Sequence, residues 1–425
     1  MASVRAMSLT SERRWWARVG LIAAVGAAVR LAFVFGVARY DGPLGDQLYY
    51  SAQALTNARG RWFEQPFVTG APAADHPPIT AALLTPITRL AESTGSFVTA
   101  QRLMMIVIGL LGLVTVALLA RRIAGPRVGL IAAAITAVYA NVWVNDGLLM
   151  AEGPTFVLVA TATLVAVDYR QRPSTSRAAL LGSLVGIMAL TRGELGLTVL
   201  LALALVAATN RSDRSGTARR VVVLVVSTVI VLAPWVVWNR ARFDDSVFLS
   251  TNDGLTLAGA NCDRAYYDDV GSWDISCAYD VEVPAGADAS VSSSVWRAAG
   301  LEYWSTHLGR YPVVAAARVA RVTSLGYLGS VIEAGEAEGR PSWVTVLGVV
   351  QFWALVPLAA IGFRSIGDRA LRLALLAFWP IVLITAVVAN AYVRFRIPAE
   401  VGLVVLASVG VATLSERRGC SCASA

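Results

Sequence analysis

The sequence Gly-Asp-Gln-Leu-Tyr-Tyr at residues 45–50 opens a polar stretch that closes with Asp-His-Pro-Pro at residues 75–78. Long apolar runs flank this stretch, at about residues 19–38 and 103–120. Runs of this length cross a hydrocarbon core roughly 30 Å thick as helices. The sequence therefore predicts an acidic, aromatic, histidine-bearing loop attached at both ends to a membrane surface.

The composition is that of a polytopic membrane protein. With 425 residues, 56% hydrophobic and 15% charged, and a mean hydropathy of +0.61, the chain has too little polar surface to cover a soluble globule of this size. The chain has no lysine, so every fixed positive charge is an arginine, and the arginines gather in short clusters between apolar runs. This distribution explains the net charge of +8 by membrane topology and excludes a nucleic-acid-binding domain.

We expect an all-α fold with about ten transmembrane helices and both termini in the cytoplasm, because the arginines favour one side of the membrane. The first external loop should carry juxtamembrane amphipathic helices. The expected organisation is a cytoplasmic N-terminus (1–18), seven helices (19–238) with the first external loop at 39–101, a small mixed external segment with an interfacial helix (239–341), three C-terminal helices (342–414) and a cytoplasmic tail (415–425).

The external segment should contain short β-prone pieces around the turn at residues 251–254. Three arginines interrupt the apolar residues of 308–327, which favours a helix lying in the membrane interface. Cys262 and Cys277 fall in the same segment and could close a small loop where oxidation is possible.

Asp46 is the first candidate for chemistry. An aspartate after a glycine at a helix start is often an N-cap that satisfies free amide groups. A carboxylate held at the membrane surface could instead serve as a general base. Spacing alone leaves both interpretations open.

His76 lies on the same loop as Asp46 and precedes two prolines, which fix an extended approach to the next helix. Ordinary helix punctuation explains the motif. A metal-ligand or phosphate-contact role is the functional alternative.

The sequence Arg394-Phe395-Arg396 breaks the topology rule, because two arginines lie outside between apolar helices. An extended chain would place both guanidiniums on one face, beside a helix N-terminus. Forked donors at such a position suit phosphate, which we favour over contact with lipid headgroups.

Arg102 and Glu152 lie near the outer ends of their predicted helices and could face the same cavity. Interface anchoring would also explain Arg102, and matching of the helix dipole would explain Glu152. Arg192 and Glu194 could form no more than a salt-bridged turn.

Taken together, these segments resemble the GT-C glycosyltransferases, in particular the family 39 branch with protein O-mannosyltransferases and aminoarabinose transferases. The resemblance spans most of the chain. It rests on residues 45–50, 58–63, 75–78, 101–103, 148–152, 190–194, 233–235 with 250–252, and 394–398.

The resemblance implies an inverting glycosyltransferase in the cell membrane that uses a polyprenyl-phosphate-linked sugar donor. The acceptor would be a hydroxyl of a glycan, lipid or protein on the extracytoplasmic side. Asp46 falls where the family keeps the acid that activates this hydroxyl; Gln47 replaces the second acid found in many members. The lysine that some relatives carry near the prolines is absent.

The remaining roles follow from the same resemblance. Arg394, Arg396, Arg102 and His76 would bind the donor phosphate. Tyr49, Tyr50, Glu152 and Arg192 would contact substrate. Some relatives hold a divalent cation, for which Asp46, His76 and Glu152 are the candidate ligands, although so few groups do not establish a metal site.

Two other function classes stay open at this stage. A transporter or flippase of lipid-linked sugars would also need arginines for phosphate, but its polar groups should lie near the bilayer midplane in broken helices. A non-catalytic assembly subunit with a degenerate site is the other alternative.

Overall fold

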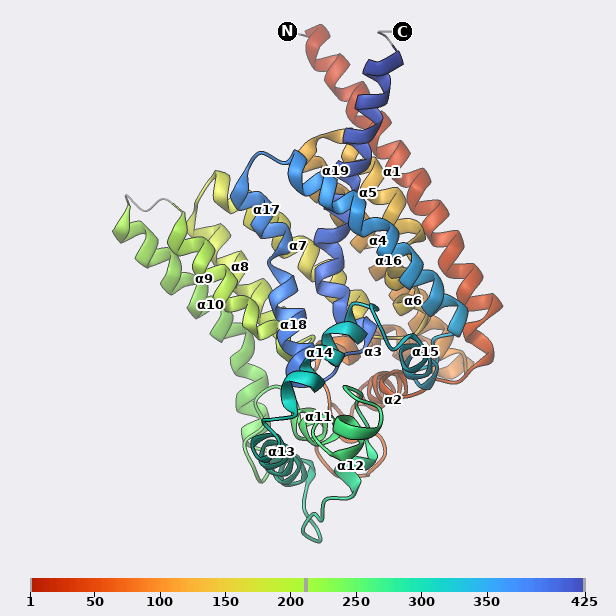
Figure 1. The fold of residues 1–425 in the computed structure, drawn as a ribbon, viewed down its shortest axis with the longest axis vertical. Coiled ribbons are helices and arrows are strands. Elements are labelled where there is room, and N and C mark those ends of the chain that lie inside the picture. The colour runs from red at the N-terminus through yellow and green to blue at the C-terminus, as the bar shows by residue number, and fades with distance from the viewer. Residues whose placement is uncertain (1, 210–212, 423–425) are drawn as a thin grey trace.

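The computed structural model describes residues 2–209 and 213–422, and this part of the chain is built almost entirely from helices (Figure 1). The described residues contain no strand, and a single isolated antiparallel bridge joins Glu64 to Pro72. The expected all-α fold is confirmed. Residues 423–425 of the predicted tail lie outside the described residues.

Long apolar helices form a bundle along the long axis of the molecule (Figure 1). They are α1 (Ala2–Gly36), α4 (Phe97–Ala124), α5 (Pro126–Val138), α6 (Ala140–Gly147), α7 (Glu152–Gln171), α8 (Thr175–Ala189), α9 (Thr198–Ala208), α10 (Arg214–Arg240), α16 (Ser342–Ser365), α17 (Arg369–Leu376), α18 (Phe378–Val388) and α19 (Ile397–Cys422).

Among the described residues, six helical segments are long and apolar enough to cross a bilayer: α1, α4, α10, α16, α17 with α18, and α19. The pair α5 and α6, bent by 53°, makes a seventh if it is one span. The other predicted spans correspond to α7, to α8, and to α9 with the preceding 3-10 helix η3 (Gly193–Leu197). Since α8 and α9 are shorter than a full crossing, the count of ten spans stays a prediction.

A side chain from another helix satisfies the backbone groups at the bend between α5 and α6. Tyr139 adopts an extended conformation, which leaves helix-end groups without partners. Gln351 of α16 accepts a hydrogen bond from the Ala140 amide at 2.7 Å and donates one to the Val138 carbonyl at 3.0 Å. A backbone break inside a bilayer needs such internal partners, because lipid offers none.

A buried ion pair fastens α6 to α1. The Arg30 Nε lies 2.6 Å from the Asp146 carboxylate, and both side chains are inaccessible to solvent. Arg30 also donates to the carbonyls of Gly26 and Ala137. The bent span is therefore held on both sides, by α16 and by α1.

Close backbone contact joins α16 to α19. A Cβ atom added at Gly362 would lie 1.9 Å from the Leu406 carbonyl oxygen, and one at Gly410 would lie 2.0 Å from the Leu358 oxygen. Small residues permit this approach between membrane helices. The position of α19 matters for function because the segment just before it carries Arg394.

A layer of short helices covers the end of the bundle opposite to the start of α1 and the end of α19 (Figure 1). The Thr251 amide donates to the Ala74 carbonyl at 2.7 Å, which joins the two predicted external regions. The helices of this layer are α2 (Asp46–Ala58), α3 (Ile79–Ala91), α11 (Asn252–Ala260), α12 (Ser276–Tyr279), α13 (Ala289–Thr306), α14 (Tyr311–Val322) and α15 (Leu328–Ala337).

The second external segment differs from the sequence-based picture. The β-prone pieces expected around residues 251–254 form no strand: the turn begins α11, and the residues just before it have no regular structure. Asp288 caps α13 by accepting from two backbone amides. Cys262 and Cys277 form a disulfide. The arginines of α14 that suggested lipid contact are buried in protein: Arg318 donates to the Val387 carbonyl at 2.7 Å, and Arg321 pairs with Asp269.

Gly362→Ala should destabilise the protein, because the new methyl group would overlap the Leu406 carbonyl. Overpacking of this kind costs about 1–3 kcal/mol. Thermal unfolding in detergent should show a lower Tm for this variant. Gly20→Ala is the matched control, since no atom lies within 4 Å of a Cβ at that position; equal Tm values for the two variants would contradict the packing.

Candidate active site

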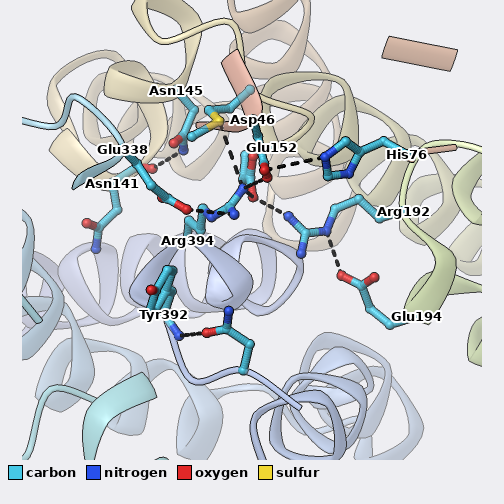
Figure 2. A network of polar contacts seen from close by, with 12 residues as sticks. Asp46, His76, Asn141, Asn145, Glu152, Arg192, Glu194, Glu338, Tyr392 and Arg394 are labelled. Carbon is cyan, nitrogen blue, oxygen red and sulfur yellow. Dashed lines mark hydrogen bonds and ion pairs between the residues drawn. The ribbon is translucent and has the colours of Figure 1, made fainter. Parts of the chain in front are cut away.

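Asp46 begins α2 but does not cap it. The N-cap position belongs to Gly45, whose φ of 53° suits glycine, and no side chain bonds the free amides at this helix end. The capping interpretation of Asp46 is therefore wrong. The carboxylate points instead into a polar cluster at the junction of the bundle and the outer layer (Figure 2).

Arg394 lies at the centre of this cluster (Figure 2). Its Nη1 is 2.8 Å from the Asp46 Oδ2 and 3.5 Å from the Glu152 Oε1, and its Nη2 is 2.7 Å from the Glu338 Oε1. The three carboxylates come from α2, from the start of α7 and from the end of α15. One guanidinium thus joins three parts of the fold.

The segment around Arg394 is the 3-10 helix η5 (Val393–Arg396), so the expected extended conformation is wrong. The two arginines consequently diverge. Arg396 is fully buried, lies 2.6 Å from Glu400 and places its guanidinium carbon 3.6 Å from the centre of the Phe352 ring. It packs against α16 and takes no part in the Asp46 cluster.

A second ion-pair group adjoins the first. Arg192 pairs with the buried Glu152, and its Nε lies 2.6 Å from Glu194. Its guanidinium also lies 4.4 Å from the Phe395 ring centre. Arg192 is therefore more than a turn residue: it fixes the Glu152 carboxylate that faces Arg394.

His76 and two tyrosines form the other wall around Asp46. The His76 Nε2 lies 3.4 Å from the Asp46 Oδ1. Its ring centre is 5.0 Å from those of both Tyr49 and Tyr50, which are buried on α2. The predicted loop residues thus meet in space.

Electrostatics separate the carboxylates of the cluster. Burial alone would raise the pKa of Asp46, but the charges of Arg394 and His76 hold it well below its usual range. Burial raises the pKa of Glu338 to about 7 against the pull of Arg394, and the neighbouring Asp46 adds to the increase. Near neutral pH, Asp46 is therefore ionised while Glu338 can hold a proton.

Arg102 does not reach this cluster. It is buried on α4 and donates to the Asp41 carbonyl at 3.1 Å. The structure therefore brings together Asp46, His76, Tyr49, Tyr50, Glu152, Arg192 and Arg394 and leaves Arg102 and Arg396 apart.

Two residues that line the site were missed from the sequence: Glu338 and Arg340. They stand on either side of Gly339 in the turn between α15 and α16. The only signal was charge directly before an apolar helix, at residues 336–340. That pattern is common at membrane surfaces and does not single out a site.

A narrow cavity of about 30 Å³ lies beside Arg394. Its lining includes Glu338, Arg340, Tyr392 and Asn145. This volume accommodates one or two water molecules and is too small for a sugar.

The cluster does not fit a divalent cation in this arrangement. The guanidinium of Arg394 stands between Asp46 and Glu152, where a metal would have to bind. Across residues 2–209 and 213–422, no three histidine, cysteine or acidic groups are placed to hold an ion. The chemistry below therefore uses no metal.

The sequence and the fold have known counterparts. Residues 75–238 match the family described as dolichyl-phosphate-mannose-protein mannosyltransferase. No curated protein matches the chain.

The archaeal oligosaccharyltransferase AglB from Archaeoglobus fulgidus, in complex with an inhibitory peptide and a dolichol-phosphate, matches with a TM-score of 0.57 and 14% identity. The match covers 97% of this chain and 52% of that one. Its apo form matches with a TM-score of 0.56 and 13% identity over 95% and 51% of the chains. ArnT from Cupriavidus metallidurans bound to undecaprenyl phosphate gives a TM-score of 0.45, 15% identity and coverage of 93% and 77%.

The chain thus has the GT-C fold, as the resemblance in its sequence predicted. It spans about half the length of the oligosaccharyltransferase structures it matches. The family match covers the part of the chain from Asp75 to Trp238, near the end of α10.

Arg394→Met should destabilise the fold, because it leaves three carboxylates facing one another without a cation. Loss of one partner from a buried charge cluster costs about 3–5 kcal/mol. The remaining carboxylates would have raised pKa values in the folded state, so the variant should lose stability as pH rises and regain it on protonation. Thermal unfolding should show a larger Tm deficit at pH 8 than at about pH 5.

Arg394→Lys is the control for this experiment, because it keeps the positive charge and should show a smaller, less pH-dependent deficit. A deficit in Arg394→Met that is independent of pH would argue against the charge cluster.

Proposed function

We propose that this protein is an inverting glycosyltransferase that moves a sugar from a polyprenyl-phosphate-sugar donor to an acceptor hydroxyl on the extracytoplasmic side of the membrane. The observation that carries the proposal is the carboxylate of Asp46, which contacts Arg394 and His76 at the end of the bundle opposite to its termini. The family match over residues 75–238 and the dolichol-phosphate bound by the archaeal enzyme support the donor class.

The reaction would proceed by direct displacement. The acceptor hydroxyl attacks the anomeric carbon, the bond from that carbon to the phosphate oxygen breaks, and polyprenyl phosphate leaves with the bonding electrons. The hydroxyl proton goes to Asp46. Attack from the face opposite to the phosphate inverts the anomeric configuration.

The low pKa of Asp46 defines how it would act. A carboxylate this strongly stabilised is a weak base, so it would orient the hydroxyl first. It would take the proton late, once the new bond has made the oxygen acidic. Since phosphate is a good leaving group, charge stabilisation by guanidinium matters more than acid catalysis on the leaving side.

The other residues of the cluster would position Asp46 and the substrates. Arg192 holds Glu152 against Arg394, and Arg394 in turn holds Asp46. Tyr49 and Tyr50 pack around His76 and would form an aromatic wall for a sugar. Arg102 and Arg396, which contact other parts of the fold, are not assigned to the phosphate.

A transporter of lipid-linked sugars is the second candidate, and the break between α5 and α6 favours it, since transporters use broken helices. However, the buried charges within the bundle are paired to each other, as in Arg30 with Asp146. The cavity lies instead at the junction of the bundle and the outer layer. This arrangement favours chemistry at the membrane surface.

Asp46→Asn should reduce sugar transfer by at least about 10²-fold, because the amide cannot accept the proton. The measurement is transfer of radiolabelled sugar from a panel of polyprenyl-phosphate sugars to native membranes. Asp41→Asn, an exposed acid on the same loop, is the control and should retain wild-type rates.

Equal transfer by wild type and Asp46→Asn would exclude Asp46 as the base. Transbilayer movement of the lipid-linked sugars, without release of sugar from any donor, would favour the transporter.

A further inference from the structure

Arg340 is a buried arginine that lacks a counter-ion. It lies in the turn between α15 and α16, and only 6% of its surface is exposed. Its side chain lines the cavity beside Arg394. Within the described part of the chain, this guanidinium makes no hydrogen bond or ion pair.

The neighbouring buried arginines each have a carboxylate partner. Arg394 pairs with three carboxylates, Arg192 with two, and Arg396 with Glu400. An unpaired buried charge is costly, whereas an anion that enters the cavity would remove the cost. Burial lowers the pKa of Arg340 only to about 10, in part because Glu338 and Glu152 oppose the shift, so the group is a cation at neutral pH.

The geometry points to the cavity beneath α15 as the binding site for the phosphate of the lipid donor, with Arg340 as its free guanidinium ligand. This inference rests on the proposed function for the choice of a lipid phosphate. A guanidinium presents forked donors that match phosphate oxygens. Arg394 can contribute to the same site only after it releases an anion of its own.

Glu338 is the anion that Arg394 would release. Its carboxylate lies 2.7 Å from the Arg394 Nη2 and forms the wall of the same cavity. The cavity of about 30 Å³ must enlarge before a phosphate can enter. Withdrawal of the Glu338 side chain would free both the space and the guanidinium, so that one anion replaces another.

The turn that carries these residues suits such an exchange. Gly339, with φ of 78°, separates Glu338 from Arg340. Val331 is the single buried side chain of α15, whereas Leu328 at one end of the helix is exposed. Sparse burial of this kind permits a local rearrangement at low cost.

Arg340→Gln should bind undecaprenyl phosphate at least tenfold more weakly than wild type, measured by calorimetry in detergent. Arg340→Lys should bind with intermediate affinity, since it keeps the charge but loses the fork. Arg364→Gln, an exposed arginine at the other end of α16, is the matched control and should bind like wild type. Undecaprenol, which lacks the phosphate, should not compete.

Thermal unfolding of the ligand-free proteins distinguishes a ligand-binding role of Arg340 from a purely structural one. Because its charge is buried and forms no ion pair, Arg340→Gln should unfold at the wild-type Tm or above it. A large fall in Tm, or lipid-phosphate affinity equal to wild type, would overturn the inference.

Binding of inorganic phosphate, measured in the same way, distinguishes a failure of this inference from a failure of the proposed function. If wild type ignores the lipid phosphate, the proposed donor class fails. Weak binding of inorganic phosphate that Arg340→Gln abolishes would still support an anion site here. Absence of any phosphate binding would overturn the site as well.

Glu338→Gln tests the exchange of anions. In wild type, Glu338 faces Arg394 from η5, Asp46 from α2, Glu152 from α7 and Arg340 beyond the turn. With its pKa of about 7, it ionises between pH 6 and 8 and then competes for Arg394. Affinity for the lipid phosphate should therefore fall about tenfold over this interval relative to Glu338→Gln.

The exposed Glu336 supplies the control for this measurement, and Glu336→Gln should follow the wild-type pH profile. Identical profiles for wild type and Glu338→Gln would show that Glu338 does not compete with phosphate.

Discussion

The guanidinium of Arg394 is the constraint on which the site depends. It bonds carboxylates from the first external loop, from the start of α7 and from the turn after α15, which are separated by hundreds of residues in the chain. Three buried or half-buried carboxylates that lie this close together repel one another, so the group needs a cation among them. The placement of η5 by α19 therefore decides whether the outer layer closes over the bundle correctly.

The same interaction sets the chemical character of each acid. Contact with Arg394 and His76 keeps Asp46 ionised, whereas Glu338 shares the guanidinium with two other carboxylates and titrates near neutrality. Glu152 is fixed from its far side by Arg192. In the proposed function, these three acids of similar intrinsic strength would take different tasks: Asp46 as proton acceptor, Glu338 as displaceable counter-ion and Glu152 as structural anchor.

The sequence was sufficient for the parts of this site that follow from topology. Topology put the loops that carry Asp46, His76 and Arg394 on one side of the membrane, and the resemblance to the GT-C glycosyltransferases implied that these residues share a site. Arg396 could not be placed, because a four-residue 3-10 turn reverses the face that it presents. Glu338 and Arg340 escaped notice because their importance comes from contacts across the fold, and charged residues before an apolar helix are ordinary. The number of membrane spans could not be predicted with certainty from the sequence either. Helices α8 and α9 are short, and their length alone does not determine whether they cross the membrane.

The pair formed by Arg30 and Asp146 has a consequence for biogenesis. During synthesis α1 enters the membrane long before α6 emerges from the ribosome, so its arginine must be inserted without its partner. A lone arginine at the centre of a helix opposes insertion by about 2.5–3.5 kcal/mol. The apolar residues of Thr10–Tyr40 must outweigh this penalty unaided. The later arrival of α6 then traps α1 in place, which gives the assembly of the bundle a defined order in time.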